Sequence, residues 1–174
     1  RAIQTAQEIS LQMDEQTYGE HAAGLFTMWS YANVEANQVA DAQRTFQQAL
    51  ERWQQLNNRV RVVEAQAGLA WVALAQGKTE EALCRIEPIL EYLGNHELHA
   101  AIEPYRIYWA VYQILLAHGD PRAQPLLQRA YTHLKNQASL VPAGETRQAF
   151  LENMPAHRRI YRRAIECLID PLPV

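Results

Sequence analysis

The sequence predicts an all-α fold, an α-α superhelix built as a right-handed solenoid of antiparallel helical hairpins. Two observations predict it. An apolar pattern recurs along the chain at intervals of 40, 40 and 41 residues, and no stretch alternates apolar and polar residues as a strand would. With 7 glycines and 8 prolines among 174 residues, little interrupts the helices.

Each copy of the pattern starts with a small residue: Ala2, Ala42, Ala82 or Ala123. Apolar or small residues follow four, seven and eleven positions later, and these separations place them on one face of a helix. The sets are Ala6, Ile9 and Met13; Phe46, Ala49 and Trp53; Ile86, Ile89 and Leu93; Leu127, Ala130 and Leu134. Each stretch is therefore predicted to be the amphipathic second helix of a hairpin, with a small first residue that lets the partner helix approach.

The first helices of the hairpins are predicted over residues 17–36, 57–76 and 97–118. Asn37, Gly77 and Gly119 follow them, and these residue types tolerate the left-handed conformation that ends many helices. In the third copy, Asp120 and Pro121 are predicted to be the N-cap and the first residue of the next helix. The turns therefore support a hairpin in each copy.

We predict a single domain over residues 1–174. It would comprise a half repeat (1–16), three repeats (17–56, 57–96 and 97–138) and a degenerate terminal helical pair (145–169). An atypical last hairpin is expected, because a terminal repeat must cover the final apolar face. Since the chain starts inside a repeat, at Arg1, we expect it to be a piece of a longer protein.

Composition argues against several kinds of partner. The 16 Lys and Arg residues against 19 Asp and Glu residues leave a net charge of -3, which provides no attraction to nucleic acid or to an anionic membrane. No apolar run approaches the roughly 20 residues of a membrane span, so we expect a cytoplasmic protein. Cys84 and Cys167 lie far apart within helical patterns, and we expect buried thiols instead of a disulfide.

Several residues fit the signature of a known repeat family. They are Leu69, Ala70, Gly77 and Ala82 in one copy, and Phe26, Ala42, Phe46 and Ala49 in another. The sequence thus resembles the tetratricopeptide (TPR) repeat family, which implies a TPR-like superhelix. Because the period is about 40 residues instead of the family's 34, longer helices are expected.

Repeats of this length resemble the C-terminal regions of large bacterial ATPase-linked signalling proteins, either maltose-activator-type transcriptional regulators or adenylate cyclases with an attached ATPase. Residues 148–158 resemble the segment that closes such arrays. The resemblance implies a scaffold for signal transduction. Its partner would be a protein or peptide, the ATPase domain of the same chain, or a second copy in a homo-oligomer; an inducer-sensing role stays open.

The resemblance also implies that the first helices line a concave groove. The residues placed towards it are Tyr31, Glu35, Glu64, Trp71, Arg106, Trp109 and Gln113. Among these the aromatic residues are the strongest candidates, because large rigid side chains dominate binding hot spots. The alternative is that the tryptophans only pack between neighbouring first helices. The Lys and Asn clamp with which chaperone-binding members hold a carboxylate is absent from the matching positions.

Arg158, Arg159, Arg162 and Arg163 form a possible basic patch on the last helix, in pairs four residues apart. They could meet an acidic partner or a nucleotide phosphate, or they could form the solvated, salt-bridged face of the helix. His96 and His99 stand three apart without a clear third ligand, which argues against a metal site. The sequence shows no nucleophile accompanied by a general base, and it has no glycine-rich phosphate loop. We therefore predict no catalytic residue and no cofactor.

Overall fold

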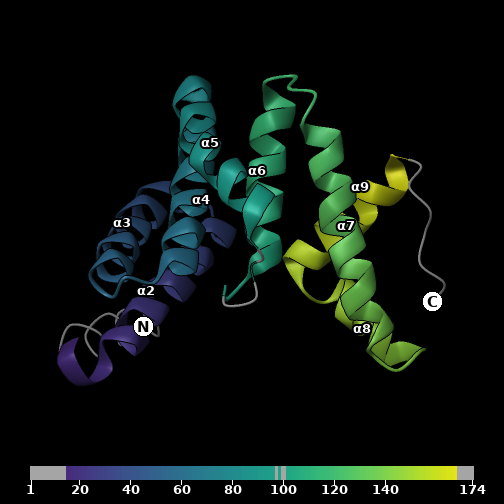
Figure 1. The fold of residues 1–174 in the computed structure, drawn as a ribbon, viewed down its shortest axis with the longest axis horizontal. Helices are drawn as coiled ribbons and strands as arrows, with labels where there is room; N and C mark the ends of the chain where they lie inside the picture. Colours follow the sequence, from purple (N-terminus) through teal and green to yellow (C-terminus); the bar gives the residue numbers. More distant parts are fainter. Residues whose placement is uncertain (1–14, 97, 99–100, 168–174) are drawn as a thin grey trace. The chain divides into compact units, whose positions relative to one another are not determined.

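The computed structural model of the chain describes residues 15–96, 98 and 101–167 (Figure 1). These residues form eight helices, and no strand occurs among them. The contacts divide the chain into two compact units, residues 1–104 and 105–174. Ala2, Ala6, Ile9 and Met13, the first predicted stripe, lie outside the described residues. The all-α class of TPR-like hairpins is confirmed.

The first unit contains α2 (Glu15–Glu35), α3 (Val39–Gln55), α4 (Arg59–Ala75) and α5 (Thr79–Asn95). Each helix packs against the next, and α2 also contacts α4. The last three helices have 17 residues each and start at residues 39, 59 and 79, which are 20 apart. Two helices with their short turns therefore fill 40 residues, and the long period comes from long helices.

Left-handed residues end the helices as the sequence predicts. Asn37, Gly77 and Gly119 have φ angles of 57°, 76° and 68°. In each turn the following backbone N–H donates to the carbonyl five residues earlier, at 2.8–2.9 Å, which closes the helix end. Asn57, with a φ of 52°, ends α3 in the same way. Asn57 lies between two hairpins and not in one of the predicted turns within a hairpin.

The second unit contains α6 (Pro104–Ala117) from its second residue on, α7 (Ala123–Ser139), α8 (Glu145–Glu152) and α9 (Pro155–Glu166). Helix α7 packs against both α8 and α9. The ring of Tyr105 in α6 meets the ring of His157 in α9 edge-on, with centroids 4.6 Å apart. The two short helices α8 and α9 occupy the predicted terminal pair, as far as it is described.

The predicted apolar stripes of α3, α5 and α7 form the core. All their members are buried, and the most exposed, Ala123, reaches only 7%. The backbone of α4 lies directly against a ring of α3: a Cβ atom placed on Gly68 would stand 2.3 Å from Cε1 of Phe46. Only glycine allows this approach, so the small residue needed for close packing lies on the first helix here.

Two helix starts differ from the prediction. The helix predicted from residue 97 begins at Pro104, and residues 101–103 are not helical. Proline suits the first turn of a helix, and it disfavours helical geometry in the residue before it. Helix α7 begins at Ala123, so Asp120 and Pro121 lie in the turn. The Asp120 carboxylate accepts the backbone N–H of Arg122 at 2.8 Å and thereby stabilises that turn.

The expected burial of both thiols is wrong for Cys84. This cysteine is exposed and Cys167 is half-buried, and both are free. Cys84 lies between the buried positions Ala82 and Ile86, on the other face of α5. Among the described helices, none is both long enough and apolar enough to cross a membrane.

Candidate functional site

A buried carboxylate joins three segments of the first unit. The side chain of Glu64 on α4 is completely buried. Its Oε1 accepts the hydroxyl of Tyr31 at 3.0 Å and the backbone N–H of Glu103 at 2.9 Å. Its Oε2 accepts the backbone N–H of Ile102 at 3.0 Å and Nη1 of Arg61 at 3.1 Å. We call these five residues the Glu64 cluster.

The chemistry of the Glu64 cluster follows from burial. A carboxylate taken out of water is costly unless it is paired and hydrogen-bonded, and here both oxygens are occupied. Ile102 and Glu103 directly precede α6, where backbone N–H groups have no acceptor within the helix. Glu64 supplies that acceptor from another helix. The cluster therefore fixes the segment that leads into α6 against α2 and α4.

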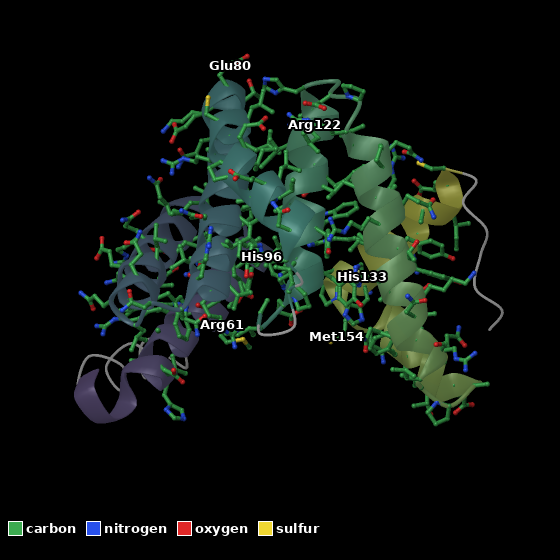
Figure 2. All side chains as sticks on the ribbon, in the orientation of Figure 1. Arg61, Glu80, His96, Arg122, His133 and Met154 are labelled. Carbon is green, nitrogen blue, oxygen red and sulfur yellow. The ribbon has the colours of Figure 1, made fainter. Side chains whose placement is uncertain are left out.

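An open pocket of about 490 Å³ lies beside the Glu64 cluster, and we call it the α2–α4 pocket. Its lining residues are Glu20, His21, Gly24, Leu25, Met28, Trp53, Arg61 and Ile102. Arg61, labelled in Figure 2, and Ile102 belong to both the pocket and the cluster. The Met28 side chain is 51% exposed. The pocket thus offers apolar surface beside a fixed polar network.

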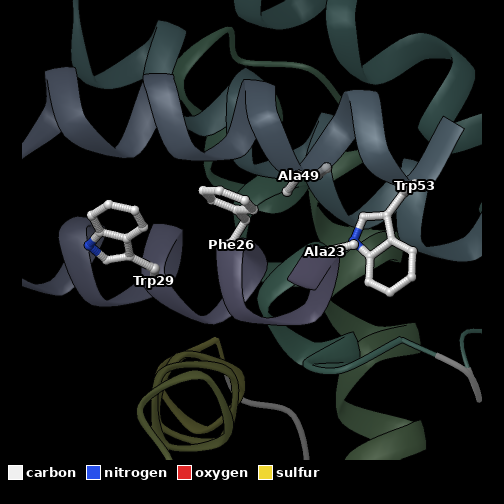
Figure 3. Packing of buried hydrophobic residues seen from close by; sticks show 6 residues of the cluster. Ala23, Phe26, Trp29, Ala49 and Trp53 are labelled. Carbon is white, nitrogen blue, oxygen red and sulfur yellow. The ribbon is translucent and has the colours of Figure 1, made fainter. Parts of the chain in front are cut away.

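Trp53 forms a rigid wall of the α2–α4 pocket. It is only 3% exposed, and it belongs to the cluster of buried residues shown in Figure 3, which includes Ala23 and Phe26. Its Nε1 donates to Oγ1 of Thr27 at 3.0 Å. The guanidinium of Arg61 lies 5.5 Å from its ring centroid, within the range of cation–π attraction. Both the ring and the guanidinium are therefore held in place.

Four of the predicted groove residues lie in the first unit. Tyr31 is 8% exposed and Glu64 is buried, and each engages the other inside the Glu64 cluster. Trp71 is partly buried and packs against a cluster that includes Tyr31 and Phe46. Glu35 is exposed at the end of α2. Contact of these residues with a partner stays a prediction.

The other three predicted groove residues lie on α6 in the second unit. Arg106, Trp109 and Gln113 are half-buried and fall on one face of that helix. The ring of Trp109 lies 5.4 Å from that of Tyr112. Within the described part of the chain, Oε1 of Gln113 is buried without a hydrogen-bond partner. This face of α6 therefore carries a hydrogen-bond acceptor that the described residues do not use.

The possible basic patch is engaged with α8. Nη2 of Arg162 forms an ion pair with Oε2 of Glu152 at 2.9 Å. Nη1 of Arg158 donates to the backbone carbonyl of Glu152 at 3.3 Å. Arg159 is half-buried on the same helix. These contacts place positive charge at the C-terminal end of α8, where it complements the helix dipole.

Arg163 points to another helix. Its Nε donates to the hydroxyl of Tyr112 on α6 at 2.7 Å, and its Nη1 pairs with Glu166 at 3.0 Å. The hydrogen bond to Tyr112 and the bond to Glu166 raise the pKa of Arg163 above its usual range. Arg163 thus connects α9 to α6.

His157 is a buried titratable group at the start of α9. It is 7% exposed, and its Nδ1 donates to the backbone carbonyl of Phe150 at 2.8 Å. Burial lowers the pKa of His157, since the charged imidazolium loses its hydration. Burial also raises the pKa of the neighbouring Tyr105 to about 12. Both groups are therefore neutral near pH 7.

No group of three or more metal-binding side chains occurs among the residues that the structure describes. His96 stacks on the ring of Tyr92, with centroids 4.5 Å apart. His99, the second histidine of the pair noted in the sequence, lies outside the described residues.

The described residues form helical hairpins, and an open pocket lies on the first unit. Residues 25–93 match the tetratricopeptide repeat family. Proteins built from such repeats are typically non-catalytic and generally mediate protein–protein interaction, so the match supports a scaffold role. No curated protein and no solved structure matches the chain at a significant level.

None of the eight residues that line the α2–α4 pocket was a groove residue predicted from the sequence; among them are Met28, Trp53 and Ile102. Trp53 belongs to a recurrent apolar stripe, which indicates core packing only. Ile102 fell within a predicted helix, in which its N–H group would donate to a backbone carbonyl instead of to Glu64. The role of Met28 is visible only in the structure, where this large apolar residue is 51% exposed between buried Thr27 and Trp29.

Proposed function

We propose that the chain is a non-catalytic protein-binding module that takes an apolar side chain of a partner peptide or helix into the α2–α4 pocket. The observation that carries the proposal is the pocket itself, an open volume of about 490 Å³ between buried Trp53 and half-exposed Met28. An apolar anchor is favoured because Arg61, the only Lys or Arg among the described lining residues, is already paired with Glu64.

The pocket suits an anchor because its walls are preorganised. Trp53 is held by Thr27, and Arg61 and Ile102 are held by Glu64. Binding then costs little ordering of side chains, which is a main source of lost affinity at interfaces. Fully desolvated pockets with aromatic walls are also where binding energy concentrates.

The wider context is part of the proposal. The resemblance of residues 148–158 to the end of bacterial ATPase-linked arrays supports a cytoplasmic, bacterial regulator as the parent protein, with a role in signal transduction or transcriptional control. The partner is then another protein, the ATPase domain of the same chain, or a second copy of the array. The groove residues Glu35, Trp71, Trp109 and Gln113 would extend the contact surface of their respective units.

A second candidate function is inducer sensing. The volume of the α2–α4 pocket falls in the range of small-molecule sites, about 300–1,000 Å³. A metabolite bound there would raise the melting temperature by mass action. A thermal-shift screen of metabolites on the wild type and on Met28→Glu tests this candidate. The substitution should remove the rise in melting temperature only when the metabolite lies in the pocket.

Selection from a random peptide display library tests the main proposal. Peptides selected on the intact chain should bind Met28→Glu at least about tenfold more weakly by fluorescence anisotropy, since a charge would enter the apolar contact. Leu140→Glu is the matched control, because Leu140 is 79% exposed and belongs to the other unit. Equal binding by wild type and Met28→Glu would contradict the proposal.

The tryptophans of the predicted groove need a separate comparison. Trp71→Ala and Trp109→Ala should weaken binding of the selected peptides if these residues contact the partner. Trp71 packs against buried residues, so its substitution also lowers stability, and binding must be measured well below the melting temperature of the variant. Undiminished binding by both variants would remove the two tryptophans from the proposed surface.

A further inference from the structure

Building on the proposed binding role of the α2–α4 pocket, we propose that the Glu64 cluster is a latch. It couples occupancy of the pocket to the order of residues 101–104, which lead into α6. The partner would therefore stabilise this segment as well as occupy the pocket.

The first step is that the pocket and the latch share residues. Arg61 and Ile102 both line the α2–α4 pocket. Both donate to the same oxygen, Oε2 of Glu64, at 3.1 and 3.0 Å. A group that packs in the pocket against Ile102 and Arg61 therefore restrains the two donors to one buried acceptor.

The second step concerns the connecting segment. Residues 101–103 have no regular helix, and the N–H groups of Ile102 and Glu103 both end on Glu64. Opening the segment breaks both bonds and leaves a buried carboxylate with two vacated positions, which is costly. It also removes the Ile102 wall of the pocket. Latch closure and an intact pocket are thus one structural event.

The third step is thermodynamic. If a bound group stabilises the closed latch, the closed latch binds that group more tightly by the same factor, because coupling free energies are reciprocal. Tyr31 and Glu64, two of the predicted groove residues, act here as positioning residues for the pocket without touching the ligand. Their effect on binding is exerted through Ile102 and Arg61.

Filling the pocket from within tests the latch without any partner. A Cβ atom on Gly24, which lines the pocket, would meet nothing within 4 Å. Gly24→Leu should therefore place apolar volume in the pocket, and Gly24→Ala is its control for helix propensity. In amide hydrogen exchange of the intact chain, Ile102 and Glu103 should exchange about three- to tenfold more slowly in Gly24→Leu than in Gly24→Ala. Equal rates would overturn the proposal.

Glu64→Gln provides the second arm. A glutamine keeps the shape but can accept with one oxygen only, so the same two amides should exchange at least about tenfold faster than in the wild type. Gly24→Leu should no longer slow them in this background. Circular dichroism melting checks that the variant folds. If it does not fold, the comparison of the two Gly24 variants still decides.

The peptides selected for the proposed function separate the two ideas. Peptides that bind the wild type, lose affinity for Met28→Glu and slow exchange at Ile102 and Glu103 support both. Peptides whose binding depends on Met28 but that do not slow amide exchange at Ile102 and Glu103 overturn the latch proposal, while the proposed binding function stands. Absence of any Met28-dependent peptide overturns the binding function, while the Gly24 comparison still tests the latch.

Discussion

The hydroxyl of Tyr31 donates a hydrogen bond to Oε1 of Glu64 across 3.0 Å, although the two residues are 33 positions apart. They lie on α2 and α4, the first helices of successive hairpins. The bond therefore links neighbouring repeats directly. Since both side chains are buried, it forms part of the interface that holds the repeats together.

Tyr31→Phe should lower the free energy of unfolding by about 1.5–3 kcal/mol, the usual worth of a hydrogen bond to a charged group. Urea titration followed by tryptophan fluorescence measures this. Tyr92→Phe is the matched control, since the contacts of Tyr92 are those of its ring, with His96 and Arg59. Equal losses for the two variants would mean that the bond between Tyr31 and Glu64 adds no stability.

Gly68→Ala should destabilise the chain by about 1–3 kcal/mol, because the new methyl group would overlap the Phe46 ring. Gly24→Ala is the control: it lies in open space and should be neutral or stabilising by up to about 1 kcal/mol. A smaller side chain at position 46 should relieve the overlap. Phe46→Leu should therefore lower the stability less in the Gly68→Ala background than in the wild type. A melting series of the four variants gives this coupling, and additive losses would refute the steric explanation.

The second unit should lose stability in mild acid through His157. Burial favours the neutral ring, so the pKa of His157 in the folded state lies below its ordinary 6.5, and the unfolded chain binds the proton more readily. The stabilisation is then complete above about pH 6.5 and is lost as the pH falls through the folded-state pKa. His157→Gln, which can still donate to the Phe150 carbonyl, should flatten the profile between about pH 7 and 5.

The control for the acid effect is His96→Gln, a substitution at an exposed ring of the other unit. It should retain the slope of the unfolding free energy that the wild type shows over the same pH range. If His157→Gln keeps the wild-type slope, the acid sensitivity has another source.

Arg162 and Arg163 of the basic patch should contribute differently to the free energy of unfolding. Arg162→Ala should change stability by less than about 1 kcal/mol, because its ion pair with Glu152 is exposed, at 64% for the arginine side chain. Arg163→Ala should cost about 1–2 kcal/mol, since the hydroxyl of buried Tyr112 loses its charged donor.

High salt provides the readout for this contrast. The small contribution of Arg162 should vanish at about 1 M salt, where exposed charges are screened over roughly 3 Å. The contribution of Arg163 should largely persist, because its bond to Tyr112 is short and partly buried. If both substitutions lowered the stability equally, and if salt abolished both effects equally, the two residues would act only as surface charges.

The sequence by itself determined most of the helices, their pairing and the apolar stripes of the core. The stripes from Ala42, Ala82 and Ala123 recur at the helical spacing, and a face of apolar residues must be buried whatever the rest of the chain does. Asn37, Gly77 and Gly119 tolerate the left-handed conformation, so the helix ends are local properties too. These features depend on residues close together in the chain, and periodicity reveals them.

Only the tertiary structure decided what the first helices do with their polar residues. The sequence offered Glu64 only as a candidate for contact with a partner; the structure shows that its carboxylate meets Tyr31, 33 positions before it, and Ile102, 38 positions after it. The α2–α4 pocket likewise combines Met28, Trp53 and Ile102 from three segments. These contacts join residues that are far apart in the sequence. They depend on how the long helices pack together and on the start of α6 at Pro104, which local sequence patterns do not reveal.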